Sequence, residues 1–412
     1  MKGRSYLLMV LLSPATLFAA PPAYEPDVLT FEESVERAWR SNSHLLSAQQ
    51  DVSIARVKVR QAKSLFYPNV NLNLNYVRHR NETLGVTAPE LGNIVLEAPV
   101  ADADDLYLGR IGFRQTLWAG GRIGSTYQLS RANLERASSS QTALREEIKL
   151  NVARSFYSLL GLQEKEKIYL ETIKAVERLP SAFAALSAKA ELRRSVAALQ
   201  KQLRETKYDY LEAMGAELFT EVRVVGNLDN VGEAPVDLQR ALSWAKQNRT
   251  ELRAIQFQQE VDRLAVSLSL AERYPVFLLG GAYEVRNNDL PITENNNWNA
   301  VLSMNIPIFD GFANLARVRE SRFRADQGRL RRVQLEDQVE RDVRSAYEDF
   351  HFWTEELDRR RNETQSIRQS RTGGGLEYAL WNMHAELGII EAKVERSIAS
   401  ALLAKSIGPQ PE

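Results

Sequence analysis

Side chains able to carry out catalysis or to bind a metal are few in this chain and form no recognisable group. There is no cysteine, and the four histidines, His44, His79, His351 and His384, fall in separate predicted segments without metal-ligand spacing. Gly373–Gly375 lies between two predicted helices rather than after a strand, so it does not match a phosphate-binding loop. The sequence therefore predicts no enzyme, no cofactor and no resident metal.

Acidic residues are abundant, but their placement favours solvated surfaces over a reaction. Glu355-Glu356 lies on a charged helix face, where such pairs are more often solvated than catalytic. Asp102, Asp104 and Asp105 could bind a divalent cation or form a solvated loop, and they lack the glycine and distal glutamate of a calcium loop. Acidic and basic residues number 53 each, so no net charge favours nucleic acid.

Residues 1–20 have the pattern of a secretory signal peptide. A charged start precedes the apolar run Tyr6–Leu12, and small residues at Leu17–Ala20 suit cleavage, although Pro21-Pro22 leaves the position of the cut open. The alternative is a buried N-terminal helix. No later stretch has the roughly 18 apolar residues of a spanning helix. We therefore expect an exported chain without a helical anchor.

The chain carries an internal duplication. Phe31–Pro68 aligns without a gap on Leu238–Pro275 at an offset of 207. Further along, Gly120 aligns with Gly311 at an offset of 191, and then Arg154 with Arg344 at 190. The predicted organisation is a first repeat over 21–215, a connecting segment over 216–236, a second repeat over 237–408 and a tail over 409–412.

Each repeat is predicted to run helix, strand, loop, strand, long helix, turn, helix. The first helices are expected over about 31–65 and 238–273. The remaining predicted elements are strands over 69–77 and 107–118, a long helix over 122–179 and a return helix over 182–215, and then strands over 276–286 and 298–308, a long helix over 314–371 and a return helix over 376–408. The long helices span about 58 residues, or roughly 87 Å, and their narrow apolar stripe favours coiled-coil packing.

The predicted strands have one polar and one apolar face. Asparagine alternates with apolar residues over Asn69–Tyr76, and Ile111, Phe113 and Leu117 share one side of the next strand. Such strands suit a transmembrane β-barrel or the edge of an ordinary sandwich. Four strands cannot close a barrel, and an open edge in lipid leaves backbone groups unsatisfied. The barrel interpretation therefore requires several copies to pool their strands.

Three segments resemble the outer-membrane efflux protein family of the TolC type: Phe66–Val70, Gln115–Gly121 and Ile306–Gly311. Val152–Tyr157 and Val343–Tyr347 resemble its long-helix signature. The resemblance implies a mainly α fold with a transmembrane β-barrel part, in which a homotrimer pools twelve strands above a long α-helical periplasmic tunnel. It also implies an outer-membrane location in a Gram-negative type of cell, contact with outer-membrane lipid, and no catalysis.

By this resemblance the chain is the passive exit duct of a tripartite efflux pump for small molecules. Its partners would be a periplasmic adaptor and, through it, an inner-membrane transporter, with no nucleic acid. One alternative is the outer-membrane component of type I protein secretion, and the sequence does not distinguish the cargo. A different class of protein, a periplasmic coiled-coil adaptor or scaffold, is a further alternative, but it leaves the two amphipathic hairpins unexplained.

The resemblance also places adaptor docking at the two helix-hairpin tips. The predicted tip residues are Pro180, Ser181, Phe183, Arg371, Gly373, Gly374, Gly375 and Leu376. Any helical hairpin needs a breaker, so these residues could instead be purely structural. Many relatives carry two aspartates after the second tip, where this chain has Trp381 and His384. These two residues could form the tunnel constriction, or Trp381 could pack between helices.

Overall fold

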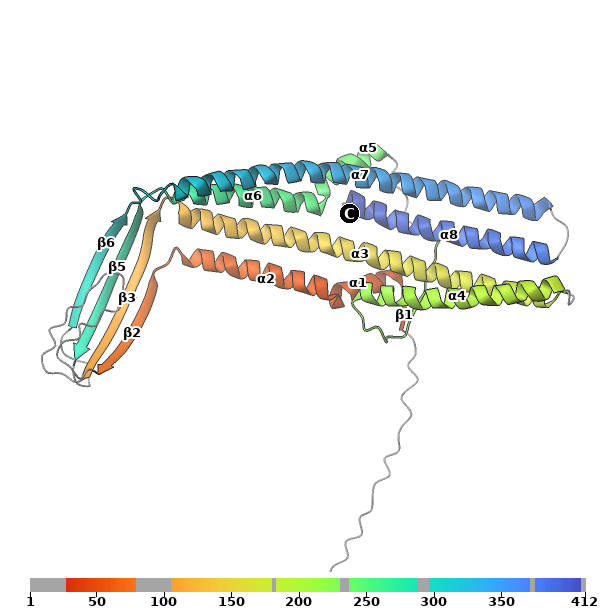
Figure 1. Ribbon diagram of the computed structural model, residues 1–412, viewed down its shortest axis with the longest axis horizontal. Helices are drawn as coiled ribbons and strands as arrows, with labels where there is room; N and C mark the ends of the chain where they lie inside the picture. The colour runs from red at the N-terminus through yellow and green to blue at the C-terminus, as the bar shows by residue number, and fades with distance from the viewer. Residues whose placement is uncertain are drawn as a thin grey trace, which may run out of the picture.

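The computed structural model describes residues 27–78, 105–179, 183–229, 237–287, 296–370 and 375–408. Over these residues the molecule is a long rod of helices with a β-sheet at one end (Figure 1). The predicted signal peptide, Asp102 and Asp104 of the acidic run, and the tail lie outside the described residues. So do five of the predicted tip residues: Pro180, Ser181, Arg371, Gly373 and Gly374.

The two repeats contain the same main elements in the same order. The first contains β1 (Asp27–Leu29), α1 (Phe31–Ser41), α2 (Ser43–Ser64), β2 (Asn69–Arg78), β3 (Asp105–Ala119), α3 (Arg122–Glu177) and α4 (Phe183–Met214), and β4 (Val222–Val224) follows it. The second contains α5 (Leu238–Asn248), α6 (Thr250–Ala271), β5 (Val276–Asn287), β6 (Asn296–Asn305), α7 (Ala313–Ser370) and α8 (Leu376–Ile407). The short strands β1 and β4 pair in parallel across the middle of the chain.

Each repeat opens on two helices, not on the single helix that the sequence predicted. Asn42 separates α1 from α2 with extended backbone angles, φ −65° and ψ 118°, and its side chain accepts hydrogen bonds from the backbone N–H groups of His44 and Leu45. Arg249 takes the same position and nearly the same angles between α5 and α6. Ser41-Asn42-Ser43 and Asn248-Arg249-Thr250 contain cap-forming residues, but helical segments flank them on both sides, and the sequence analysis therefore predicted one helix across each break.

The main sheet is antiparallel, in the order β2-β3-β5-β6. A β-bulge interrupts the pairing of β3 with β5, because Thr116 lies opposite Leu278 while Trp118 lies opposite Phe277. The bulge therefore puts Trp118 on the apolar face, where the alternation of the sequence predicted Leu117. The last strand ends at Asn305, earlier than predicted; Pro307 follows, and proline has no N–H to give to a ladder.

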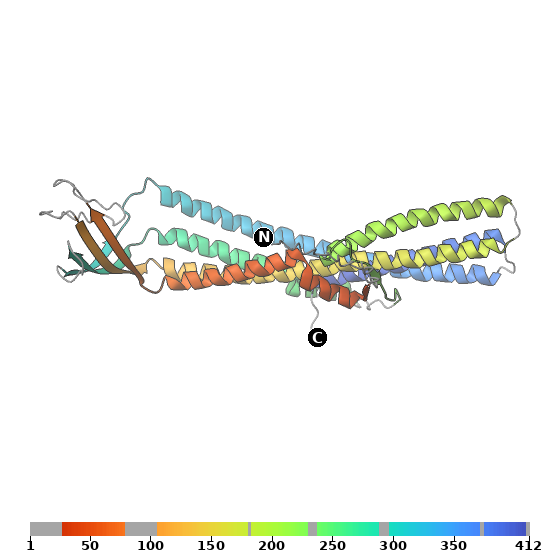
Figure 2. The same ribbon diagram turned by 90° about the horizontal axis from the view of Figure 1, so that it is seen from below.

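The helices form a layer that continues away from the sheet (Figure 2). Along its length α3 packs against α2 and α6 near the sheet and against α4 and α8 farther away. At both levels α7 packs beside the second repeat's shorter helices, α6 and then α8. The layer therefore has α2 and α4 at one edge and α7 at the other.

The largest apolar clusters lie at the middle of the rod, where α1 and α5 pack against the long helices. The first cluster includes Leu45, Val152, Phe156, Tyr210, Leu211 and Met214. The second includes Ala245, Val339, Val343, Ala346, Phe350 and Leu403. The first cluster also includes Val394 of α8 and so joins the two repeats, whereas the second lies wholly within the second repeat.

The return helix of the first repeat ends at a glycine that its surroundings require. Gly215 has φ +66°, and the backbone N–H of Ala216 donates to the carbonyl of Leu211, as in a Schellman motif. A Cβ at Gly215 would lie 2.6 Å from the Cα of Asn42. Glycine therefore permits both the left-handed turn and the close approach of α4 to the break between α1 and α2.

Candidate functional site

The described residues offer no centre for metal or acid–base chemistry. No three histidine, aspartate or glutamate side chains among them could hold a metal ion. His44 and His384 are exposed on helices, and His351 lies against Tyr347 with ring centroids 4.4 Å apart. Within these residues no helix combines the length and apolar character needed to cross a membrane. The surfaces of the sheet and the ends of the helices are the features left to examine.

One face of the sheet is apolar and open to its surroundings. Register and alternation put the following residues on it: Val70, Leu72, Leu74, Tyr76, Tyr107, Ile111, Phe113, Trp118, Phe277, Leu279, Tyr283, Val285, Trp298, Ala300, Leu302 and Met304. Leu74 and Trp298 are 71% and 74% exposed. A continuous apolar surface of this kind is rare on a soluble monomer and marks a membrane or protein contact. This face therefore needs an apolar environment.

Aromatic side chains gather at both ends of the apolar face. At the end remote from the helices Tyr76 and Tyr107 lie 5.1 Å apart. At the helical end the Trp118 ring lies 6.0 Å from the rings of both Tyr274 and Phe277. Aliphatic residues such as Leu74 lie between the two groups. Aromatic girdles on either side of an apolar band about 25 Å tall are typical of membrane barrels.

The opposite face of the sheet is mainly polar, although Leu108, Leu278 and Val301 also lie on it. It carries Asn69, Asn71, Asn73, Asn75, Arg110, Arg114, Thr116, Glu284, Arg286, Asn297, Asn299 and Ser303. The side chain of Asn299 accepts a hydrogen bond from the backbone N–H of Ala282 at 3.1 Å. Asparagine, arginine and glutamate on alternate positions suit a face in contact with water.

Two strands of the sheet have an open side. In the described part of the chain β2 pairs only with β3, and β6 pairs only with β5. Because every pairing in this sheet is antiparallel, β2 and β6 run in opposite directions. An unpaired row of backbone N–H and C=O groups is costly in lipid, where no water can satisfy it.

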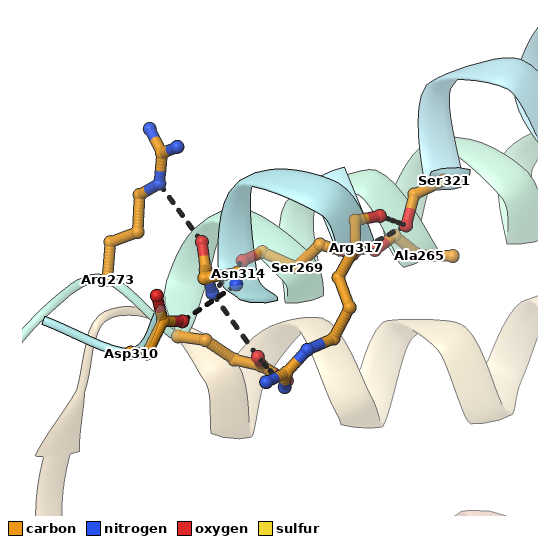
Figure 3. A network of polar contacts seen from close by, with 8 residues as sticks. Ala265, Ser269, Arg273, Asp310, Asn314, Arg317 and Ser321 are labelled. Atoms are coloured by element: carbon orange, nitrogen blue, oxygen red, sulfur yellow. Dashed lines mark hydrogen bonds and ion pairs between the residues drawn. The ribbon is translucent and has the colours of Figure 1, made fainter. Parts of the chain in front are cut away.

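A polar network joins α6 to the start of α7 where the chain leaves the sheet (Figure 3). Asn314 is 9% exposed, and its side chain accepts a hydrogen bond from Arg273 Nε at 3.0 Å and donates to the carbonyl of Ser269 and to Glu272. Its backbone N–H donates to Asp310 at 2.7 Å. Glu272 also accepts from Arg317. The network fixes the angle at which the second hairpin meets its helices.

The tip residues within the described parts of the chain lie at the start of two helices. Phe183 begins α4, and Gly375 and Leu376 begin α8. Leu376 packs with Val176, Leu192 and Met383 in a small apolar cluster that joins the two helical hairpins. The structure therefore brings the beginnings of the two return helices together at the end of the rod farthest from the sheet.

Trp381 and His384 lie on α8 within three turns of this end. Trp381 is half-buried, and its ring lies 6.2 Å from that of Tyr378. His384 is exposed, and its Nδ1 lies 2.7 Å from the carbonyl of Leu380 one turn earlier. The small apolar cluster at this end includes Met383, Ala379 and Leu380 but not Trp381.

Sequence reasoning missed one cluster in the connecting segment. Asp229 accepts from Arg361 on α7 at 2.6 Å and from Lys393 on α8 at 2.8 Å. Burial alone would raise the pKa of Asp229, but the contacts with Lys393 and Arg361 outweigh it and hold the pKa below its ordinary value. A single aspartate in an irregular stretch gave no sequence signal for this role.

The amino-acid sequence resembles one known protein family. A family model described as outer membrane efflux protein matches residues 35–214. It spans most of the first repeat, including β2, β3 and the whole of α3. No curated protein matches the sequence.

Several solved structures have the same fold at low sequence identity. A crystal structure of CusC has a TM-score of 0.76 at 15% sequence identity, and the match covers 92% of each chain. The open state of the Neisseria gonorrhoeae MtrE outer membrane channel has a TM-score of 0.75 at 15% identity, covering 92% of this chain and 88% of that one. The Vibrio cholerae outer membrane protein VceC has a TM-score of 0.70 at 13% identity, covering 92% and 96%.

Proposed function

We propose that three copies of this chain form the passive exit duct of a tripartite efflux pump for small molecules, since the outer membrane efflux protein model matches residues 35–214. The predicted family resemblance, mixed barrel and helical fold class, outer-membrane location and non-enzymatic character agree with this family of outer-membrane channels. The proposal adds the number of copies, the pump and the cargo class.

The two open edges carry the proposal. The sheet ends at β2 and β6, and the helical layer near it ends at α2 and α7. Each edge strand is joined along the chain to the edge helix on its own side, since α2 leads into β2 and β6 leads into α7. A neighbouring copy can therefore meet sheet and helices along one continuous side. Because β2 and β6 are antiparallel, β6 of one copy can pair with β2 of the next and repeat the pattern until a ring closes.

Apolar side chains along both edge helices support the same contact. On α2, Ile54 and Val57 are about half exposed, and on α7 Phe323, Leu330 and Val333 are more than half exposed. In a trimer these two edges would face each other, and twelve strands would form one barrel with the apolar face in lipid. The polar face would then line the passage.

The helices would continue this passage as a tunnel. With 56 residues, α3 is about 84 Å long at the usual helical rise. We propose that the tips at the far end dock a periplasmic adaptor that links the duct to an inner-membrane transporter. The docking residues would be Pro180, Ser181, Phe183, Arg371, Gly373, Gly374, Gly375 and Leu376.

We place the tunnel constriction at Trp381 and His384, close to these tips. The half-buried indole and the exposed imidazole lie nearly one turn apart on α8, so three copies would supply a ring of each. A ring of bulky apolar side chains can close a water-filled tunnel.

Purification from cell envelopes with and without cross-linking tests the proposal. We expect a trimer in detergent that separates into monomers only on heating, and an adaptor captured by the cross-linker. A folded, monodisperse monomer would contradict the pooling of strands. Cross-linking to a protein-secretion transporter would replace small molecules by proteins as cargo, and release from membranes by salt alone would favour the periplasmic scaffold alternative.

A further inference from the structure

The polar face of the sheet carries an excess of positive charge. Its charged residues within the described strands are Arg110, Arg114 and Arg286 against one acid, Glu284, which leaves two net positive charges per chain. The other polar residues of this face are neutral asparagines, threonine and serine. The charged side chains therefore lie among uncharged polar side chains.

The arginines lie at three levels along the strands. Arg286 is nearest the loops, Arg110 lies two residues closer to the helices and is directly opposite Glu284, and Arg114 lies four residues beyond Arg110. At the level of Arg114 the register partners are Asn69, Gly280 and Val301. No acid in the described strands lies directly opposite Arg114 or Arg286, but Arg114 is farther along the sheet from Glu284, so its level is the most strongly positive.

These arginines are also free to meet a solute. Among the described residues no ion pair joins any of the three arginines to an acid, not even Arg110 to Glu284, which lies directly opposite it. The neighbours of Arg114 on the same face are small, with Gly112 between Arg110 and Arg114 along the strand and Gly280 opposite Arg114, whereas Leu108 lies opposite Arg286. Little bulk therefore separates the Arg114 guanidinium group from the space in front of the sheet.

We propose that the passage through the sheet is selective for anions and that the exported molecules carry carboxylate, phosphate or sulfonate groups. This inference rests on the proposed duct, in which the polar face lines the passage. Guanidinium groups bind such oxyanions in a planar, two-point geometry, and rings of arginine are a common basis of anion selectivity. Arg114 and Arg286 are the main determinants, because Glu284 offsets much of the charge of Arg110.

The expected selectivity is moderate. Two net charges per chain give six in a trimer. If the guanidinium groups lie roughly 10 Å from a passing ion and salt is about 0.1 M, one ring of three such charges favours chloride over potassium roughly fivefold. The preference should grow as salt is diluted, because the Debye length increases.

The test is the reversal potential of the purified full-length trimer in a planar lipid bilayer with a potassium chloride gradient. The wild-type channel should favour chloride. R114E removes the net charge of the polar face and should abolish the preference, and R114E/R286E leaves a net charge of minus two and should reverse it. R114K keeps the charge and should resemble the wild type, whereas E284Q should increase chloride preference.

Each outcome separates the selectivity from the duct itself. A wild-type trimer that conducts but favours potassium would overturn the anion inference and leave the duct intact. Conduction with the wild-type preference retained in R114E/R286E would also overturn it, because the barrel arginines would then not set the selectivity. A heat-sensitive trimer that carries no current even when the proposed constriction is widened by W381A would refute the duct. The heat-sensitive trimer band of each variant checks its assembly.

Discussion

Where sheet and helices meet, the second repeat is held by a polar network and the first by apolar and aromatic contacts. Asn314 in the second repeat aligns with Ile123 in the first, at the offset of 191 that relates the glycines after the strands. Arg273 aligns with Phe66, whose ring lies 6.1 Å from that of Tyr127. The second junction is thus held mainly by side-chain hydrogen bonds, and the first by ring contacts together with one hydrogen bond from Gln115 Nε2 to the carbonyl of Phe66 at 3.3 Å.

At the middle of the rod this contrast is partly reversed. In the first repeat Tyr210 and Ser34 share a buried hydrogen bond of 2.5 Å, while their counterparts in the second repeat, Leu403 and Ala241, are apolar and buried. The helix breaks differ as well: Asn42 caps α2 in the first repeat, whereas the aligned Arg249 is buried in the second and contacts Asp342 at 3.3 Å.

The two repeats therefore keep one backbone with different chemistry at matching positions. A buried polar group is stable only beside its own partner. Placing Tyr210 where Leu403 belongs would leave its hydroxyl group facing Ala241 instead of Ser34. The unlike cores thus disfavour exchange of the equivalent helices, which matters in a molecule whose halves are otherwise similar.

The strongest test of this contrast is removal of the partner of Arg249. In D342A the guanidinium group, with a side chain 7% exposed, keeps only its weak contacts with Glu251, of which Nη2 to Oε1 is 3.4 Å. Breaking a buried ion pair on one side is costly, and since Asp342 itself is about one-third exposed we expect a loss of about 3 kcal/mol. Urea unfolding in detergent, followed by circular dichroism, measures it.

The matched change in the first repeat is N42A. It removes the cap of α2 and the 3.2 Å hydrogen bond from the Asn42 amide to the carbonyl of Ala213. The expected loss is about 1–2 kcal/mol, the usual range for a cap. If D342A and N42A lose the same free energy of unfolding, the ion pair of Arg249 stabilises its helix break no more than the cap at Asn42 does.

The junction gives the next largest effect. N314A leaves Arg273 Nε and the carbonyl of Ser269 without their 3.0 Å and 3.2 Å hydrogen bonds to this side chain, and we expect a loss of about 2 kcal/mol. I123A, in the half-buried counterpart, should cost about 1 kcal/mol, because only part of the side chain leaves an apolar environment. The same unfolding measurement applies, and a larger loss in I123A would reverse the proposed contrast.

Much of the fold could be predicted because it repeats and alternates. The aligned halves predicted the order of elements, and the alternation of asparagine with apolar residues predicted the two faces of β2. The breaks at Asn42 and Arg249 and the bulge at Leu117 could not be read in this way. Each concerns the backbone of one residue, set by contacts with segments distant in sequence, and the surrounding pattern continues across it.

The surfaces were more predictable than the polar contacts. Residue types alone predict the two hairpins and their apolar face, and they also predict that other copies of the chain are needed to pair the edge strands. Asp229 and Asn314 depend on partners up to 164 residues away, such as Lys393, and nothing in their local sequence marks them. The inferred anion selectivity could not be derived from the sequence, because it depends on the pairing of the strands. That pairing places Arg114 opposite Gly280 and away from the acidic residue of the polar face, Glu284.

The contrast at Tyr210 can be tested through the pH dependence of stability. Burial raises the pKa of Tyr210 to about 12, above its ordinary value of 10.0. Since Ser34 donates its own hydrogen to the carbonyl of Thr30, the Tyr210 hydroxyl is the donor in their shared bond. The folded state holds this proton more tightly than the unfolded state. Its contribution is therefore complete below pH 10 and is lost between pH 10 and 12, by about 1.4 kcal/mol at pH 11.

Comparison of two phenylalanine variants isolates this contribution. Y210F cannot ionise, so the fall in its free energy of unfolding between pH 9 and 11 should be smaller than that of the wild type by about 1.4 kcal/mol. Y208F, on the same helix but with a side chain 50% exposed, should follow the wild type. If Y210F loses stability as steeply as Y208F over this range, the buried phenol is not what distinguishes the first repeat from the apolar pair of Leu403 and Ala241 in the second.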